Sequence, residues 1–368
     1  MYAQILALET EVPPKFLTQE AYNSAMKRLL NLDEVHNNLL QRITSGSRIQ
    51  KRHLVASDIS EEGIHGTIFG IETKASPPTT KQRNDIYKEA APELAASVCH
   101  KTLEQWGGDC QAITHVISVS CTGMLAPGIE FLLIEKLGLS PQVERLGINF
   151  MGCFGAFKGL AIAKALALES PKHRVLVVCT ELCSLHVQEN LSSETLVANS
   201  LFADGAAAMV VGVGLREGEK PLLELYSQKS EALDDTRDLM TWEAGDHGYF
   251  MRLSPTIPFH IKRSVSSFAQ SLIGPERTFN QCAWAAHPGG KAILEGIAQA
   301  CRLEKEQLSA SWEVLYNYGN MSSPTFLFVL KEVLKTRCQK KWVIGLGFGP
   351  GLSIEGLLLK RVDENVAG

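Results

Sequence analysis

The sequence predicts an α/β fold built from two similar halves. From about residue 90 onward, short apolar runs typical of buried strands, such as "ITHVISVS", "RLGINF" and "RVLVVC", alternate with helix-forming runs such as "GAFKGLAIAKALAL". The charged stretch "GLREGEKP", residues 214–221, contains two glycines and ends in proline, which is typical of a break between units. Beyond it the alternation resumes with "CAWAAH", "GKAILEGIAQAC" and "KWVIGLGF". We therefore expect an N-terminal half at 1–216 and a C-terminal half at 217–368.

The individual elements follow from local patterns. "QEAYNSAMKRLL" and "VHNNLLQRI" predict helices, and the polar stretch "KASPPTTKQRND", residues 74–85, predicts a loop. "APELAASVCHKTLEQWG" predicts a helix because its apolar residues share one face. "APGIEFLLIEKLGL" predicts a helix that begins at Pro127 and ends at Gly138. "ADGAAAMVVGVG" predicts a further buried strand.

Composition excludes several classes of function. The 368 residues are 45% hydrophobic and 21% charged, with a net charge of −4 and no long run of Lys or Arg, so nucleic acid is an unsuitable partner. Nine cysteines are scattered over the chain without zinc-site spacing, which favours free thiols in a reducing cytoplasm and no metal. The first residues lack a basic secretory start, and no apolar run reaches the roughly 18 residues that a membrane span needs.

Cys153 is the first candidate for chemistry. It lies between two glycines, where the predicted strand "RLGINF" gives way to the predicted helix "GAFKGLAIAKALAL". Helix-end amides stabilise an anion, so a cysteine there can have a lowered pKa and act as a nucleophile. The alternative is a small buried thiol that only packs.

Two other polar residues occupy similar turns. His287 follows the apolar strand "CAWAA" and precedes Pro-Gly-Gly, and Asn320 lies in the glycine-containing turn "YGNMSSPT". Each alone could be structural, as a hydrogen-bonded histidine and an ordinary turn residue. Together with Cys153 they are a candidate set of catalytic residues, because a histidine and an asparagine amide can stabilise an oxyanion or enolate beside a thiol nucleophile.

On these motifs the chain resembles the chalcone synthase-like type III polyketide synthases of the thiolase superfamily. The resemblance runs over nearly the whole chain through "GCFGAFKGL", "LFADGAAA", "AHPGGKAIL", "YGNMSSPT" and "GFGPGLSIEGLLL". It implies a thiolase fold with five layers, α-β-α-β-α, and a homodimer in the cytoplasm. It implies an acyltransferase that loads an acyl-CoA starter on Cys153, extends it with malonyl-CoA, and cyclises the product to a pyrone, resorcinol or phloroglucinol type. His287 and Asn320 would stabilise the enolate, and no cofactor is needed beyond the coenzyme A thioesters.

The resemblance also assigns residues around the cavity. Phe202 matches one of two gatekeeper phenylalanines, and Phe250 in "HGYFMRLS" is the candidate for the second. The other pocket positions that it implies are Thr122, Glu181, Cys183, His186, Ser322, Gly349 and Pro350. Arg42 matches a coenzyme A contact, and Arg48, Lys51 and Arg52 are further candidates for the adenosine phosphates. The short loop "CTGMLAPG" and the compact Cys183 favour apolar volume and a fatty acyl starter, whereas His186, a polar ring able to hydrogen-bond a phenolic hydroxyl, favours a hydroxycinnamoyl starter.

Three alternatives remain open. A ketoacyl synthase that initiates fatty-acid synthesis would require an acyl carrier protein. A cysteine hydrolase also uses Cys, His and Asn, but nothing around Cys153 resembles the "CGSCW" flanks of papain-like enzymes. A catalytically silent binding protein is disfavoured by the three intact candidate residues.

Overall fold

The computed structural model describes residues 2–56, 59–60, 63–64, 77–336 and 340–362. Its largest sheet has nine strands in the order β13-β14-β15-β10-β1-β9-β8-β6-β7. These strands are β1 (Gln4–Glu11), β6 (His115–Ser120), β7 (Glu144–Asn149), β8 (Arg174–Leu182), β9 (Asp204–Gly212), β10 (Leu223–Ala232), β13 (Cys282–Ala286), β14 (Trp342–Gly349) and β15 (Ser353–Arg361).

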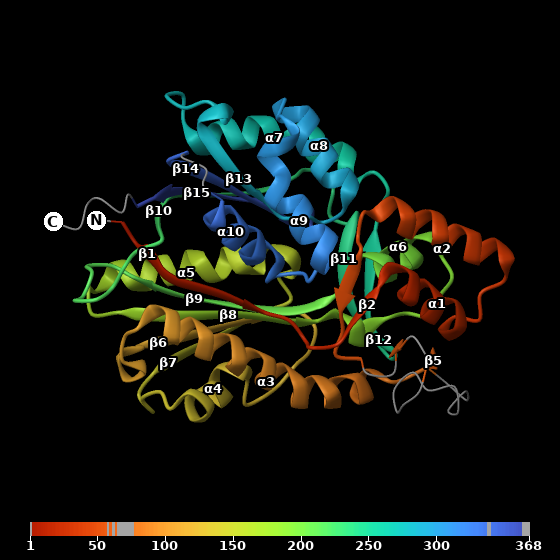
Figure 1. The fold of residues 1–368 in the computed structure, drawn as a ribbon, viewed down its shortest axis with the longest axis horizontal. Coiled ribbons are helices and arrows are strands. Elements are labelled where there is room, and N and C mark those ends of the chain that lie inside the picture. The colour runs from red at the N-terminus through yellow and green to blue at the C-terminus, as the bar shows by residue number, and fades with distance from the viewer. Residues whose placement is uncertain (1, 57–58, 61–62, 65–76, 337–339, 363–368) are drawn as a thin grey trace.

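The sheet and the main helices form five layers, α-β-α-β-α. Figure 1 shows helices between the two parts of the sheet, below the lower part and above the upper part. The middle pair is α5 (Gly155–Glu169) and α10 (Thr325–Lys335), the lower pair is α3 (Thr80–Trp106) and α4 (Ile129–Leu137), and the upper pair is α7 (Ile257–Ile273) and α8 (Lys291–Cys301). The mixed α/β class and the thiolase arrangement predicted above are thus confirmed.

Three apolar clusters fill the spaces between these layers. One lies around α3 and α4, with Val98, Leu133 and Val178 among its members. The middle cluster surrounds α5 and α10, where the Phe157 and Phe326 rings lie 4.2 Å apart between their centroids. The third packs α7 and α8 against β13–β15. Strands β8 and β9 are buried along their whole length, as strands covered by helices on both faces must be.

The N-terminal strand β1 lies in the middle of the sheet, between β10 and β9. Gln4 and Ile5 of β1 pair with Glu224 and Leu223 of β10, and most of β1 also pairs with β9. Strand β1 therefore connects the strands on its two sides in one hydrogen-bonded sheet. No described helix combines the length and apolar character that crossing a membrane requires.

The remaining elements lie mainly toward one end of the molecule, shown on the right in Figure 1. They are β2 (Phe16–Thr18), α1 (Gln19–Leu29), α2 (Glu34–Ser47), β3 (Lys51–His53), β4 (Ile59–Ser60), β5 (Gly63–Ile64), α6 (Ser193–Leu201), β11 (Met240–Gly245), β12 (Gly248–Leu253) and α9 (Ser309–Tyr318).

Three local predictions were wrong. "RLGINF" does form strand β7, but most of its residues are exposed because β7 is the last strand of the sheet. Residues 80–85 are helical rather than loop, since Thr79 and Gln82 form a capping box that starts α3. Helix α4 begins two residues after Pro127, at Ile129.

Candidate active site

Three loops bring Cys153, His287 and Asn320 to one cavity of about 690 Å³. Cys153 lies in a short 3-10 turn, Gly152–Phe154, immediately before α5. His287 follows β13, and its backbone N–H donates to the Leu346 carbonyl at 2.8 Å. Asn320 lies between α9 and α10, and its backbone pairs with Phe202. A cavity of this size lies in the range of small-molecule sites.

Positive backbone φ angles shape the turn that carries Cys153. Phe150 has φ 58° and Gly152 has φ 67°. A side chain at Gly152 would be strained and would also lie 2.7 Å from Cδ of Pro350, while a Cβ at Gly349 would overlap the Phe154 ring. Gly349 and Pro350 thus pack behind the nucleophile turn and position it.

The Asn320 amide is oriented by its own loop. Its Oδ1 accepts a hydrogen bond from the Ser322 N–H at 2.9 Å. Both amide atoms, Oδ1 and Nδ2, lie 3.9 Å from Cys153 Sγ, and of the two it is Oδ1 that the Ser322 N–H occupies. This leaves an N–H donor available for a negatively charged oxygen beside the sulfur.

His287 is buried, at 1% exposure, and neither ring nitrogen has a hydrogen-bond partner within the described chain. Burial lowers the pKa of the imidazole to about 3, so the ring is neutral at physiological pH. An unpaired buried donor costs roughly 1–3 kcal/mol, which a bound oxygen would offset. The ring is therefore suited to receive a ligand.

The Cys153 thiol is not a preformed thiolate, contrary to the expectation of a lowered pKa. Burial raises the pKa of Cys153 to about 11, although hydrogen bonds with Ser322 and Asn320 act in the opposite direction. The cost of removing the thiolate from water is larger here than the stabilisation that the N-terminus of α5 gives to a negative charge. The thiol must lose its proton to a base as it attacks.

Glu181 is the centre of a buried polar network. Its carboxylate accepts hydrogen bonds from the Cys121 N–H at 2.9 Å, from Thr122 Oγ1 at 2.8 Å and from Ser323 Oγ at 2.6 Å. Ser322 joins the network only through Cys121, whose Sγ lies 3.4 Å from Ser322 Oγ. The predicted residues Thr122, Glu181 and Ser322 therefore lie together, and Cys121 and Ser323 are network members that sequence reasoning missed.

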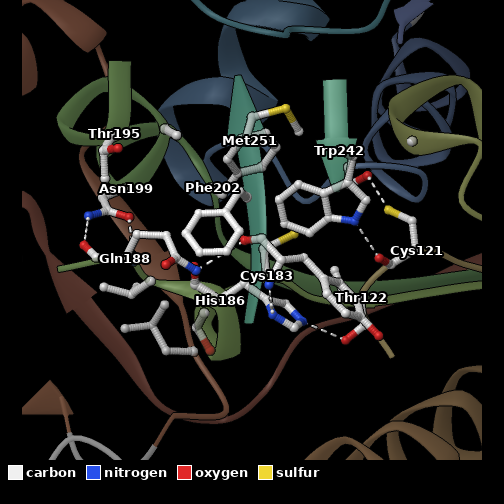
Figure 2. Close-up of a pocket in the computed structure, with 18 of the residues that line it drawn as sticks. Cys121, Thr122, Cys183, His186, Gln188, Thr195, Asn199, Phe202, Trp242 and Met251 are labelled. Carbon is white, nitrogen blue, oxygen red and sulfur yellow. Dashed lines mark hydrogen bonds between the residues drawn. The ribbon is translucent and has the colours of Figure 1, made fainter. Parts of the chain in front are cut away.

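A second, smaller cavity of about 50 Å³ lies beside the first (Figure 2). Cys183, His186, Trp242, Tyr249 and Met251 are among its lining residues. We expected Cys183 and the short "CTGMLAPG" loop to leave a large apolar space for the starter, and the observed cavity is much smaller than that. Trp242 occupies this region, and its Nε1 donates to the Cys121 carbonyl at 2.6 Å. Trp242 and Tyr249 come from the β11–β12 hairpin, whose contribution the sequence analysis did not anticipate.

His186 is a hydrogen-bonded wall of this inner cavity. Its Nε2 donates to the Thr122 carbonyl at 2.7 Å, and its Nδ1 accepts from the Tyr249 N–H at 3.1 Å. Its ring stacks on Tyr249 with 4.3 Å between centroids. Burial lowers the pKa of His186 to about 4. With both nitrogens occupied, the ring has no donor left for a phenolic substrate.

Phe202 and Met251 line both cavities, and they are the residues common to the two linings. Figure 2 shows them close together. Phe250, the expected second gatekeeper, also lines the inner cavity but not the large one, and it is 41% exposed. Its neighbour Met251 lines both cavities, so Met251 lies where the two cavities meet.

The basic residues proposed to bind coenzyme A do not line the large cavity. Arg42 is exposed on α2, and Arg48 lies over the Trp312 ring at 5.4 Å. Lys51 lies over the Phe16 ring, and Arg52 is buried, donating to the Ser200 carbonyl at 2.8 Å. Helix α2 instead contributes uncharged residues, Ile43, Gly46 and Ser47.

Comparisons with known proteins agree with this geometry. Residues 2–215 match the family described as chalcone and stilbene synthases, N-terminal domain, and residues 224–363 match the corresponding C-terminal domain. Type III polyketide synthase A of Arabidopsis thaliana is 33% identical over 376 residues, covering 99% of this chain and 94% of that protein. Probable polyketide synthase 1 of Dictyostelium discoideum is 33% identical over 365 residues, which are 97% of this chain but 11% of that protein.

A solved structure shows the same fold. The C-terminal type III polyketide synthase domain of "Steely1", a type I/III hybrid from Dictyostelium, superposes with a TM-score of 0.92 at 33% identity, covering 99% of this chain and 100% of that one. The fold and the thiol-bearing cavity are those of a condensing acyltransferase. The chain belongs to the chalcone and stilbene synthase family, and it is a type III polyketide synthase.

Proposed function

We propose that this chain loads an acyl group from coenzyme A onto Cys153, extends it with malonyl-CoA and cyclises the product, with no cofactor beyond the thioesters. The observation that carries the proposal is that Cys153, His287 and Asn320 share one cavity, in which the His287 ring nitrogens have no hydrogen-bond partner among the described residues. Under this proposal the first half, 1–216, supplies the nucleophile and the second half, 217–368, supplies both donors.

The chemistry would proceed in three steps. The Cys153 sulfur attacks the starter carbonyl, its proton passes to the neutral His287 ring, and coenzyme A departs as the thiol by taking up that proton. The carboxylate carbon–carbon bond of malonyl-CoA then breaks, releasing carbon dioxide and placing the electron pair on the thioester oxygen as an enolate. Neutral His287 and the Asn320 Nδ2 group donate to that oxygen, where charge develops. The enolate carbon attacks the Cys153 thioester, which releases the sulfur and leaves the extended chain on coenzyme A, and that chain returns to Cys153 for the next cycle.

Incubation with labelled malonyl-CoA and a panel of acyl-CoA starters, read by mass spectrometry, tests this function. We expect products that contain the starter plus one or more ketide units in the absence of any carrier protein. Dependence on an acyl carrier protein would instead identify a ketoacyl synthase, and hydrolysis without extension would identify a hydrolase.

An aliphatic starter fits the inner cavity better than a hydroxycinnamoyl one. The polar side chains there already have partners: Asn199 Nδ2 donates to the Gln188 carbonyl at 2.9 Å, and Gln188 Nε2 donates to three backbone carbonyls. The Nδ2 group of Asn199 and the Nε2 group of Gln188 are therefore engaged with backbone carbonyls instead of being directed at a ligand. An apolar chain could enter if Met251, a flexible side chain, rotates away from Phe202.

Met251 is accordingly predicted to control starter length. Met251→Ala should shift the preferred starter toward longer acyl chains and Met251→Phe toward shorter ones, with kcat/KM changing by about fourfold per methylene that gains or loses burial. Steady-state kinetics with acetyl-, hexanoyl- and lauroyl-CoA measure the shift. Arg252→Ala, at an exposed position of the same strand outside both linings, is the matched control. An unchanged chain-length profile in both Met251 variants would contradict this role.

We also propose a homodimer that works in the cytoplasm. Strand β7 ends the sheet with an exposed edge, and exposed apolar side chains surround it, namely Met124, Phe131, Leu146 and Met151. Such an unpaired edge beside apolar surface is suited to contact a second chain. The described cysteines are all free thiols, which supports a reducing compartment.

The dimer proposal predicts that Leu146→Glu weakens self-association, because it places a charge beside the strand edge. Sedimentation velocity should show the wild-type chain as a dimer and this variant shifted toward monomer at equal concentration. Leu215→Glu serves as the control, since Leu215 is also exposed but lies in the 214–221 connection. A monomeric wild-type chain would contradict the proposal.

A further inference from the structure

The large cavity carries one cationic side chain among its described lining residues, Lys291. This lysine is the first residue of α8, and its side chain is 38% exposed, which places it at the opening. The other charged lining residues are Glu194 and Glu295. Glu295 is the nearer, with 3.8 Å between its Oε1 and the lysine Nζ, so the two form a loose, solvent-exposed pair.

A lysine in the first helical turn is locally unfavourable. The positive end of the helix dipole repels a cation there. In addition, Gly290 provides no side-chain cap, and the N–H groups of Lys291 and Ala292 have no partner in the described chain. A negatively charged group placed between these N–H groups and the lysine would satisfy both. Residues that break a local preference in this way are often functional.

A second observation indicates that a ligand occupies the same cavity. His287, four residues before Lys291, is buried and lines the cavity, and no described residue pairs with either of its ring nitrogens. The cavity thus has unsatisfied donors at its closed end and a cation with free N–H groups at its opening. A ligand with a reactive carbonyl at one end and an anion at the other would match that arrangement.

We propose that Lys291 and the first turn of α8 bind a phosphate group of the coenzyme A thioester, an inference that rests on the function proposed above. The phosphate replaces the weak contact with Glu295. It holds the thioester so that its carbonyl oxygen lies against His287 and Asn320. Charge-assisted contacts to phosphate of this kind position a substrate more than they alter its chemistry.

The test compares a substrate that has phosphates with one that has none. Lys291→Ala should raise KM for malonyl-CoA roughly tenfold with little change in kcat, and it should leave kcat/KM for malonyl-N-acetylcysteamine unchanged. Lys291→Arg should retain most of the affinity, and Glu295→Gln should not weaken it. Lys262→Ala is the matched control, because Lys262 is exposed on the neighbouring α7 and bonds Gln299 instead of lining the cavity.

Calorimetric binding of coenzyme A gives a readout that does not depend on condensation. We expect a similar loss of affinity in Lys291→Ala and a weaker effect at high salt. An equal fall in activity with both malonyl substrates would assign Lys291 to the malonyl carboxylate and overturn the proposal, as would unchanged coenzyme A binding. Coenzyme A binding that depends on Lys291 in a chain that forms no polyketide would refute the proposed function while supporting this site.

Discussion

Cys153→Ala is expected to abolish covalent loading of every acyl starter and all polyketide formation. The sulfur is the only proposed attachment point, so without it no intermediate exists for the enolate to attack. The side chain is buried and small, and replacing a thiol with a methyl group there should leave the packing around Phe154 and Pro350 nearly intact. The loss should therefore appear in a folded protein.

Intact-mass measurement after incubation with hexanoyl-CoA checks this result. The wild-type chain should gain one acyl group and Cys153→Ala none, while Cys301→Ala, which removes a buried thiol in α8, should load normally. Among the other cysteines, Cys121 is the one to check for an acyl adduct, because its Sγ also lies against Ser322. An adduct that persists on Cys153→Ala would show that another thiol accepts the acyl group.

His287→Ala is expected to lower malonyl-CoA decarboxylation by roughly 10²–10³-fold, the usual effect of removing one oxyanion donor. The cleanest background is Cys153→Gln, which cannot be acylated yet keeps His287 and Asn320. That variant should still convert malonyl-CoA to acetyl-CoA and carbon dioxide. The double variant Cys153→Gln/His287→Ala should lose this activity.

The pH dependence of malonyl-CoA decarboxylation is a second test of the role of His287. Because burial lowers the pKa of His287 to about 3, the ring stays neutral between pH 8 and 5, and decarboxylation should show no inflection near the usual histidine pKa of 6.5. Carbon dioxide release measured across this range checks the point. His173→Ala, which removes a histidine that bonds the Leu166 carbonyl, is the control. If the folded Cys153→Gln/His287→Ala variant decarboxylates malonyl-CoA at the rate of Cys153→Gln, His287 does not stabilise the enolate.

The three central residues were predictable because each follows a recognisable chain signal. Cys153 and His287 stand where apolar strands give way to glycine-containing turns, and Asn320 stands between two helices beside Gly319. In α/β folds such strand ends gather at one edge of the sheet. Strands β7 and β13 are at opposite ends of the sheet order, however, so the three residues were grouped by their shared chemistry and by the family resemblance, not by the alternation of strands and helices.

The gate and the inner wall were harder to predict because they depend on tertiary packing. Phe250 and Met251 both line the inner cavity, and only the packing of β12 decides that Met251 reaches the large cavity as well. Trp242 enters the inner cavity through pairing of β11 with β12, which no local signal in its own strand specifies. Burial of Cys153 also could not be read locally, and it reverses the direction of the expected pKa shift.

The most direct test of the account is mass analysis of the peptide that contains Cys153 after rapid quenching of the wild-type chain with an acyl-CoA starter and labelled malonyl-CoA. The account predicts that this peptide carries the starter and, in addition, the starter extended by labelled ketide units. Product formation with no acyl group on the Cys153 peptide, or with the extended chain on a different residue, would contradict it.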